Sequence, residues 1–364
     1  MAHGLEERNG KFSFAENGSR ERAWHGLGEV VNEPMFVADA LKRCRADYKV
    51  QLQPIVALSD ELINAMDNGT FINAAMLREC LVDKTKATVR TDLNKSLGIV
   101  SEGYGIVQNE DAFKFVDMLC SGLDANRTEK PTIECCGVLG NGERVFVTCK
   151  MPQDIILNSH TDDRIETYVV FTTSHDGTGA VRCMVTNIRV VCSNTLNWAM
   201  KHNSGRISFR HSSKVMNRLD LLNKENAEFA YRTLGLWNEY ESVFKESLEH
   251  LKNIRVSERD LDKIIAEITL ADEAKKAFLE TRNIEHEAIA TRGRNIFLGM
   301  KEAIEGGIGQ SILESGTALW AINGITSYYQ NEANYKNEEV MFDNVMDGNV
   351  YKKVQKAYDM LIAA

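Results

Sequence analysis

The sequence places a histidine and a carboxylate side by side in a polar, glycine-containing stretch, SHDGTG at 174–179. His175 and Asp176 could supply a general base together with its orienting or metal-binding carboxylate, as a hydrolase or nuclease requires. A catalytic site of this kind needs a second histidine or carboxylate that folding brings close, and the sequence does not indicate which residue that would be. Walker, HExxH and GxSxG patterns are absent from the chain. We therefore favour a non-enzymatic protein and keep catalysis as an alternative.

The same stretch offers a second kind of chemistry. The backbone amides around Gly177, Thr178 and Gly179 could cradle a phosphate, because glycines permit close approach of an anion. Further along, Cys192 and Ser193 precede a helix expected at 195–201. At a helix N-terminus either side chain could act as an activated nucleophile, and Ser193 could instead cap the helix. For each of these residues, a structural role stands beside the chemical one.

Positive charge collects directly after the turn. The chain as a whole has a net charge of −9, yet residues 182–224 carry eight basic side chains against the single carboxylate of Asp220. That segment is therefore +7 and the remaining residues −16. A basic patch on an acidic protein is typical of a polyanion footprint, with a solvated charged face as the structural alternative. The residues we expect to bind nucleic acid, with Trp198 as the base-stacking member, are Arg182, Arg189, Lys201, Arg206, Arg210, Lys214 and Trp198.

The flanking pattern predicts the elements that must position these residues. Residues 168–171 and 181–185 are β-branched and aromatic-rich, which favours two strands joined by the polar turn. Asn141 between two glycines predicts a hairpin from strands at 132–139 and 144–150. A further strand is expected at 48–58, with Pro54 at an edge or bulge. Helices are expected at 35–46 and 109–119 and, after residue 213, at 215–251, 257–269, 271–303 with a break, 315–331 and 348–363.

These elements predict an α+β protein. We expect a mixed or antiparallel sheet with β-hairpins in the N-terminal half, followed by a helical C-terminal part. The predicted boundary separates an α+β core domain at 1–212 from a helical region at 213–364. A chain of 364 residues exceeds what one core normally organises, which agrees with two parts.

Composition narrows the class of protein. No apolar run is long enough to span a bilayer and the N-terminus lacks a secretory signal, so we expect a cytoplasmic protein without a membrane partner. Eight cysteines in apolar contexts, without a CxxC pair, favour buried reduced thiols over a zinc site. We accordingly expect neither a metal nor a cofactor.

Several long motifs resemble one family. The chain is similar to the phage/plasmid-like proteins classed as a domain of unknown function, over about residues 1–330. That resemblance implies a mobile-element setting and no established activity. The motifs that carry it are WHGLG at 24–28, YGIVQN at 104–109, GERVFVTCKMP at 142–152, SHDGTGAVR at 174–182, IRVVCSNTLNWA at 188–199 and GTALWAINGITSYY at 316–329.

A second resemblance is architectural. A hairpin, further strands and a helix beside positive charge are similar in outline to the core of phage single-strand annealing recombinases. It implies single-stranded DNA as the partner, annealing in replication or recombination, and assembly into a homo-oligomer. Fold alone does not fix function, so two other classes stay open. One is an anti-defence or regulatory protein that binds a host protein, and the other is the enzyme built on His175 and Asp176.

Overall fold

The structure, a computed structural model, describes residues 5–18, 27–121, 130–158, 163–189, 194–195, 206–209, 211, 242–336, 340–341, 344–345 and 348–363. The chain divides into two compact units. Unit 1 comprises Met1–Cys149, Val170–Cys183 and Ile207–Arg232, and unit 2 comprises Lys150–Val169, Met184–Arg206 and Thr233–Ala364. The predicted domain boundary at 212/213 lies outside the described residues and stays a prediction.

The large sheet is mixed, as the sequence predicts. Its order is β12-β11-β10-β9-β8-β3-β4, with β13 paired to β11 off this path. The pair β3–β4 is parallel, whereas β3–β8 and β11–β12 are antiparallel. The strands are β3 (Phe14–Asn17), β4 (Glu29–Val31), β8 (Thr132–Leu139), β9 (Arg144–Asn158), β10 (Asp163–Ser174), β11 (Val181–Arg189), β12 (Asn194–Thr195) and β13 (Arg206–Phe209).

The predicted hairpin joins β8 to β9. Both glycines of Gly140-Asn141-Gly142 have left-handed φ, 68° and 109°, which suits glycine because it lacks a Cβ. The side chain of Glu143 accepts the backbone amide of Asn141 and closes the loop. On β9, alternate residues (Val145, Val147 and Cys149) are buried, and on β8 Ile133 and residues 136–139 are buried, so the hairpin contributes to the core of unit 1.

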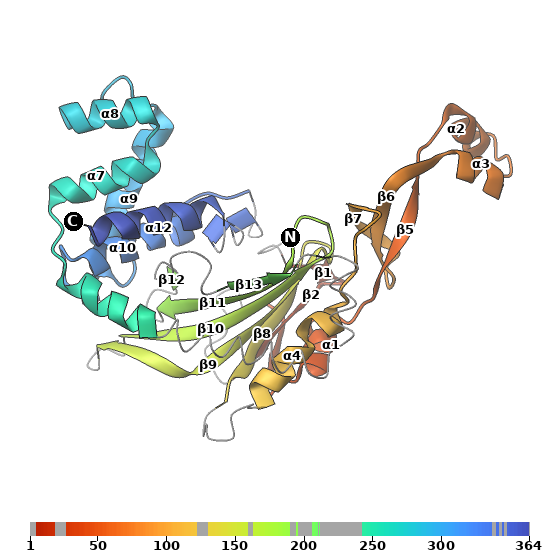
Figure 1. The fold of residues 1–364 in the computed structure, drawn as a ribbon, viewed down its shortest axis with the longest axis horizontal. Helices are drawn as coiled ribbons and strands as arrows, with labels where there is room; N and C mark the ends of the chain where they lie inside the picture. The colour runs from red at the N-terminus through yellow and green to blue at the C-terminus, as the bar shows by residue number, and fades with distance from the viewer. Residues whose placement is uncertain are drawn as a thin grey trace. The chain divides into compact units, whose positions relative to one another are not determined.

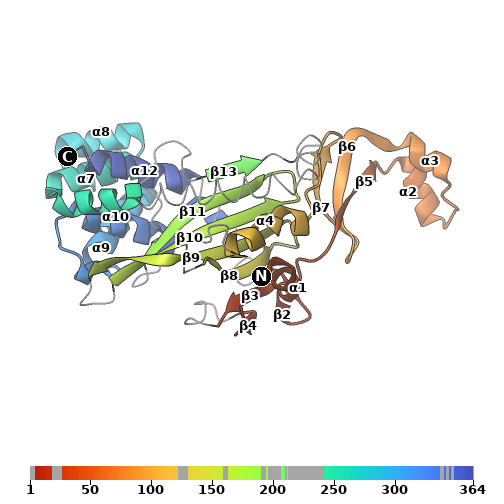
Figure 2. The ribbon, with the colours of Figure 1, turned by 60° about the horizontal axis from the view of Figure 1, so that its bottom comes forward.

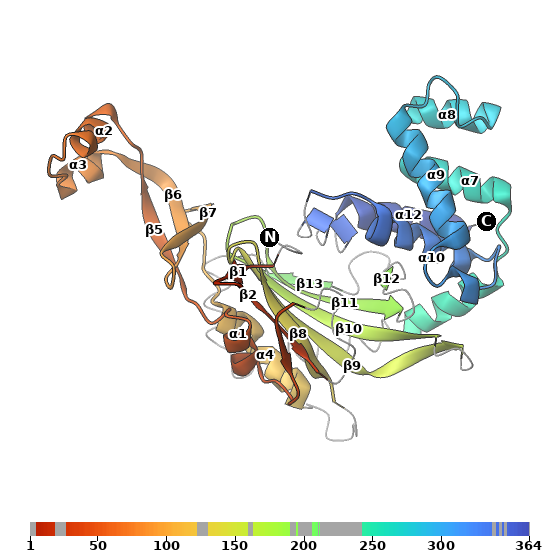
Figure 3. The same ribbon diagram turned by 180° about the vertical axis from the view of Figure 1, so that it is seen from behind.

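A second sheet projects two short helices (Figures 1 and 3). It runs β5 (Val50–Val56), β6 (Leu81–Arg90) and β7 (Lys95–Ser101), antiparallel throughout. The register shifts between Pro54 and Val56 on the edge strand β5, which confirms the predicted edge or bulge. The helices α2 (Asp60–Asp67) and α3 (Ala74–Glu79) fill the connection from β5 to β6.

Two helices pack against each other in unit 1, and the first of them contacts β8. They are α1 (Val37–Arg43) and α4 (Asn109–Ser121), which lie side by side in Figure 1. Leu41, Phe113 and Val116 are almost fully buried between them and the sheet. Near the N-terminus, β1 (Glu7–Arg8) and β2 (Lys11–Phe12) form a short antiparallel pair.

The C-terminal part of unit 2 is helical, in agreement with the sequence. Residues 242–253 are helical. The helices that follow, shown in Figure 2, are α7 (Glu258–Thr269), α8 (Asp272–Thr281), α9 (Thr291–Gly306), η2 (Gln310–Ile312), α10 (Ala318–Ser327), the π-helix η3 (Tyr328–Glu332) and α12 (Asn349–Leu361). The predicted break within 271–303 separates α8 from α9.

Helix α10 lies at the centre of this assembly. It contacts α9 and α12, and nine of its ten residues are buried. Gly324 permits the close approach to α9, because a Cβ there would lie 2.4 Å from the Ile304 Cα. Gln310 satisfies the buried polar groups beside it by donating to Ile304 O and accepting from Asn323 Nδ2, both at 2.6 Å. Across the described residues, no helix is long and apolar enough to traverse a bilayer.

Candidate functional site

The SHDGTG turn joins β10 to β11 within unit 1, and its backbone is fixed by residues distant in sequence. The amide of His175 donates to the Glu143 carbonyl at 2.7 Å. Thr88 Oγ1 donates to the His175 carbonyl at 2.6 Å, and the Tyr104 hydroxyl donates to the Ser174 carbonyl at 3.1 Å. These bonds hold the turn against the β8–β9 loop, β6 and the residues after β7.

The side chain of Asp176 accepts hydrogen bonds from residues of its own turn. Its Oδ1 accepts from the Thr178 amide at 2.9 Å and from the Ser174 hydroxyl, and its Oδ2 accepts from the Thr178 hydroxyl at 2.7 Å. This is an Asx-type turn, in which an Asp side chain accepts from the backbone amide two residues further on. Burial would raise the pKa of Asp176, but hydrogen bonds from Ser174 and Thr178 outweigh it and lower that pKa below its ordinary value. The carboxylate is therefore charged at neutral pH.

The glycines beside this turn make room for backbone packing. Gly177 has a left-handed φ of 82°, and a Cβ there would lie 2.9 Å from Val100 Cγ1. On β7, a Cβ at Gly98 would lie 2.5 Å from the Asp176 carbonyl oxygen. Gly98 thus lets the backbone of the turn pack directly on the strand.

The phosphate hypothesis for Gly177, Thr178 and Gly179 meets an electrostatic obstacle. The amide of Thr178 already donates to the Asp176 carboxylate, which places negative charge where an anion would bind. A phosphate would have to displace that carboxylate or bind beside it, and both cost energy. The arrangement is that of a self-capped turn.

His175 lies in the core. The side chain is fully buried, and Nε2 lies 2.7 Å from Asn109 Oδ1. Asn109 Nδ2 donates to the Ala46 carbonyl at 2.8 Å, which orients the amide so that its oxygen faces the imidazole. Nε2 therefore carries the proton, and Nδ1 has no hydrogen-bond partner among the described residues. His175 and Asp176 do not hydrogen-bond each other within the described set, because each side chain is bonded elsewhere.

A second buried histidine adjoins the first. His211 stacks on the Tyr104 ring, with centroids 5.1 Å apart, and its centroid lies 6.4 Å from that of His175. Burial lowers the pKa of His175 to about 3 and that of His211 to about 4. Both imidazoles are therefore neutral at physiological pH. Within the described part of the chain, no group of three histidine, cysteine or acidic residues is placed to hold a metal ion.

An ion-pair network lies beneath His175. The Tyr48 ring packs edge-on against the imidazole, and the Arg90 guanidinium lies 3.8 Å from the centroid of that ring. Arg90 is fully buried and donates to Glu6, to the Asn141 carbonyl and, through two nitrogens, to Asp92. Burial opposes charge on Arg90, but Asp92 and Glu6 outweigh it and raise its pKa above the ordinary value.

The basic residues predicted to bind nucleic acid are only partly described. Arg182 is half-buried on β11, and the backbones of Arg189 and Arg206 lie in β11 and β13. The remaining candidates lie outside the described residues: Lys201, Arg210, Lys214, Trp198, Cys192 and Ser193.

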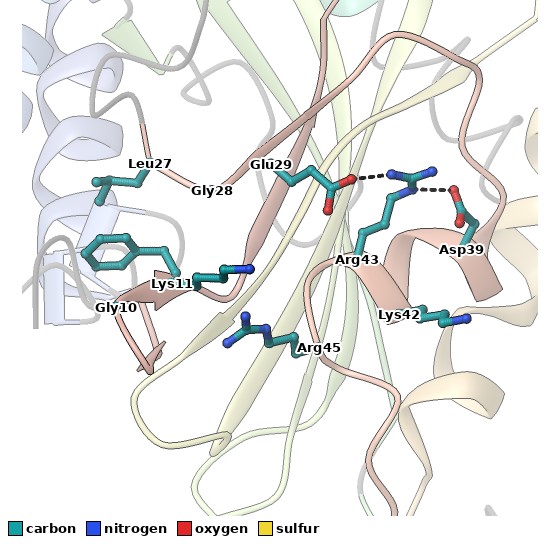
Figure 4. Close-up of a pocket in the computed structure, with 10 residues that line it drawn as sticks. Gly10, Lys11, Leu27, Gly28, Glu29, Asp39, Lys42, Arg43 and Arg45 are labelled. Atoms are coloured by element: carbon teal, nitrogen blue, oxygen red, sulfur yellow. Dashed lines mark hydrogen bonds and ion pairs between the residues drawn. The ribbon is translucent and has the colours of Figure 1, made fainter.

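A basic cavity, missed by sequence reasoning, opens in unit 1 (Figure 4). It has a volume of about 900 Å³, and Phe12 and Leu27 form its apolar wall. Arg43 bridges the two carboxylates, Glu29 and Asp39, as the dashed lines in Figure 4 show. The other cations of the lining are Lys11, Lys42 and Arg45. With four cations against two carboxylates, the lining carries a net charge of +2.

The cavity is lined by residues of β2, by residues 27–29 at the start of β4, and by residues of α1 and the segment just after it. Because these segments are separate in sequence, no local motif indicates the cavity. The buried network around His175 is also assembled from distant segments. The one sequence signal for Arg90 is that charged residues lie close to predicted strands. No local pattern indicates that it pairs with Glu6, which is 84 residues away.

The family model described as Domain of unknown function (DUF932) matches residues 96–352. The match begins in β7, contains the SHDGTG turn and the whole of α10, and ends in α12. No curated protein and no solved structure matches the chain.

Proposed function

We propose that this chain, which belongs to the family described as Domain of unknown function (DUF932), binds single-stranded DNA and promotes annealing. The family description names no activity, so the proposal rests on the residues of the chain. The setting we propose is replication or recombination of a phage or plasmid, which the resemblance of its motifs supports.

The observation that carries the proposal is the pairing of β13 with β11. The first residue of β13 is Arg206, and β11 carries Arg182 and Arg189. Both strands belong to the segment with net charge +7 in a protein of −9. Adjacent strands bearing arginines supply the cations that neutralise phosphates along a single strand.

The surroundings of His175 support a binding role over a hydrolytic one. A general base has to reach a proton on the substrate, and His175 is fully buried with Nε2 bonded to Asn109. Asp176 is occupied by its own turn. Annealing requires neither an acid nor a base, so this geometry is compatible with it.

The test is a double charge reversal in the basic segment, Arg206→Glu with Arg210→Glu. The matched control, Arg259→Glu with Lys263→Glu, makes the same charge change on the exposed face of α7. We expect the first variant to lose on the order of tenfold or more in affinity for a single-stranded oligonucleotide, since two phosphate contacts disappear. The control should bind like the unmodified protein. Equal affinities in the two variants, with unchanged melting temperatures, would discard the segment as the footprint.

A further inference from the structure

The connection from β5 to β6 exposes an unusual amount of apolar surface. We define the tip as residues 58–82, which include α2 and α3 (Figure 3). Phe71 is 85% exposed, Leu58 63% and Met66 56%. Ile63, Leu77, Leu81 and Val82 are exposed as well. Exposed hydrophobic residues gathered in one short connection are typical of interaction sites on soluble proteins.

The tip is a folded element with capped helices. Ser59 Oγ accepts the Leu62 amide at 3.3 Å and caps α2, and Asn73 Oδ1 accepts the amides of Ala75 and Met76 and caps α3. Leu62 and Ala65 are buried beneath the helices. The exposed side chains are therefore displayed by a folded element with its own small core.

The negative charge of the tip restricts which kind of partner can bind it. It carries the carboxylates Asp60, Glu61, Asp67 and Glu79 and the single cation Arg78, for a net charge of −3. All five side chains are exposed, and none makes an ion pair with a described residue. Two tips packed together would bring like charges into contact, which is unfavourable at an interface. A complementary partner surface would therefore be apolar and basic.

The cavity defined above has that chemistry. Its apolar wall is Phe12 and Leu27, its lining is +2, and the side chains of Lys11 and Lys42 have no hydrogen-bond or ion-pair partner among the described residues. A volume of about 900 Å³ admits several side chains of a helix end. Figure 4 shows Lys11 and Arg45 extending toward the same space.

A chain cannot place its tip in its own cavity within this fold. The cavity residues of α1 precede β5, and the tip follows it. At roughly 3.3 Å per residue, the seven residues of β5 separate the two by about 20 Å. Figures 1 and 3 show α2 and α3 at the ends of β5 and β6 away from α1.

We propose that the acidic, apolar tip of one chain docks into the basic cavity of a second copy. Phe71 inserts against Phe12 and Leu27, and Lys11 and Lys42 pair with the carboxylates of the tip. The contact joins different surfaces of identical chains, so it closes a dimer when two copies exchange tips reciprocally, and it builds a ring or filament when each tip passes to a further copy. This proposal does not rest on nucleic-acid binding, because neither β11 nor β13 takes part.

The test uses two variants that each remove one side of the contact. The tip variant is Met66→Ser with Phe71→Ser, and its control is Ile99→Ser on β7, which removes a side chain of similar exposure. The cavity variant is Lys11→Glu with Lys42→Glu, and its control is Arg259→Glu with Lys263→Glu. Every changed side chain is exposed, and circular dichroism checks that the variants are folded.

Mass is measured by light scattering across a range of concentrations. We expect the unmodified protein and both controls to exceed the monomer mass of 40.9 kDa, reaching the mass of a dimer or of a larger assembly as concentration rises. Each variant alone should stay monomeric. An equimolar mixture should form a dimer and nothing larger, because one intact tip then meets one intact cavity.

Three outcomes would overturn the proposal. One is an unmodified protein that remains monomeric throughout, and another is a tip variant that assembles like the unmodified protein. The third is a mixture that stays monomeric, which would show that the cavity does not receive the tip and would leave the tip to a foreign protein. Failure of DNA binding would not affect any of these readouts.

Discussion

The imidazole of His175 and the amide of Asn109 are joined across 66 positions of sequence, with Nε2 2.7 Å from Oδ1. Because Asn109 Nδ2 is bonded to the Ala46 carbonyl, the amide can only accept from the imidazole. This contact links the turn after β10 to the first residue of α4. It fixes His175 as a neutral, buried donor.

Acid should therefore weaken the fold through His175. Its pKa is about 3 when folded and 6.5 ordinarily, so below pH 6.5 the unfolded chain takes up a proton that the folded chain does not. The stabilising contribution is complete above pH 6.5 and is lost as pH falls toward 3, by up to about 1.4 kcal/mol per pH unit. His211 adds to the loss in the same direction.

Urea unfolding at neutral pH and at about pH 5 measures this effect. We expect His175→Gln to lose less stability on acidification than the unmodified protein does. The control, His250→Gln at an exposed position of the helix at 242–253, should retain the original pH dependence. An unchanged pH dependence in His175→Gln would contradict the assignment of a buried neutral imidazole.

Arg90 should be among the most sensitive positions in unit 1. Replacing it with methionine removes one of the two cations paired with the Glu6 carboxylate, which is 5% exposed and keeps Arg8 Nε at 3.2 Å. Because Arg8 remains, we expect a loss toward the lower end of the roughly 3–5 kcal/mol of unfolding free energy that breaking a buried ion pair costs. Lys49→Met, which breaks an exposed pair with Glu110, should cost less than about 1 kcal/mol. Equal losses in the two variants, measured by urea unfolding, would mean that the network contributes little.

Gly98 should tolerate no side chain. A Cβ would lie 2.5 Å from the Asp176 carbonyl oxygen, so the turn or β7 must shift, at a cost of about 1–3 kcal/mol. Gly103→Ala provides the control, because no heavy atom lies within 4 Å of its Cβ position. A melting temperature lowered in the first variant alone would confirm the packing of the turn on β7. Equal melting temperatures would refute it.

Local signals in the sequence predicted much of the fold. The Gly140-Asn141-Gly142 loop and the alternation around it predicted β8 and the start of β9 to the residue. Helical periodicity placed α7 and α12 within a residue or two at each end. β6 extends from Leu81 to Arg90, because it pairs with β5 along this length. The helices of the tip were missed, since α2 and α3 have few buried residues to create a periodic pattern.

The site was harder to predict for a physical reason. Local propensity predicted the turn between β10 and β11, because a turn depends on residues that are neighbours in sequence. The partners of His175 come from β6, the β8–β9 loop, α4 and the segment after β13, and such contacts depend on tertiary folding. For the same reason, the expected dyad of His175 and Asp176 could not be tested against its surroundings from sequence alone.

Nucleic-acid binding is the central claim, and fluorescence anisotropy of a labelled single-stranded oligonucleotide, with a duplex control, tests it most directly. Four phosphate contacts, from Arg182, Arg189, Arg206 and Arg210, predict a slope of about −2.8 for log affinity against log salt, or a loss of roughly 50-fold between about 50 and 200 mM salt. We expect tight binding at low salt, that dependence, and preference for the single strand. Absence of binding at low salt, or equal binding of single strand and duplex, would contradict the account.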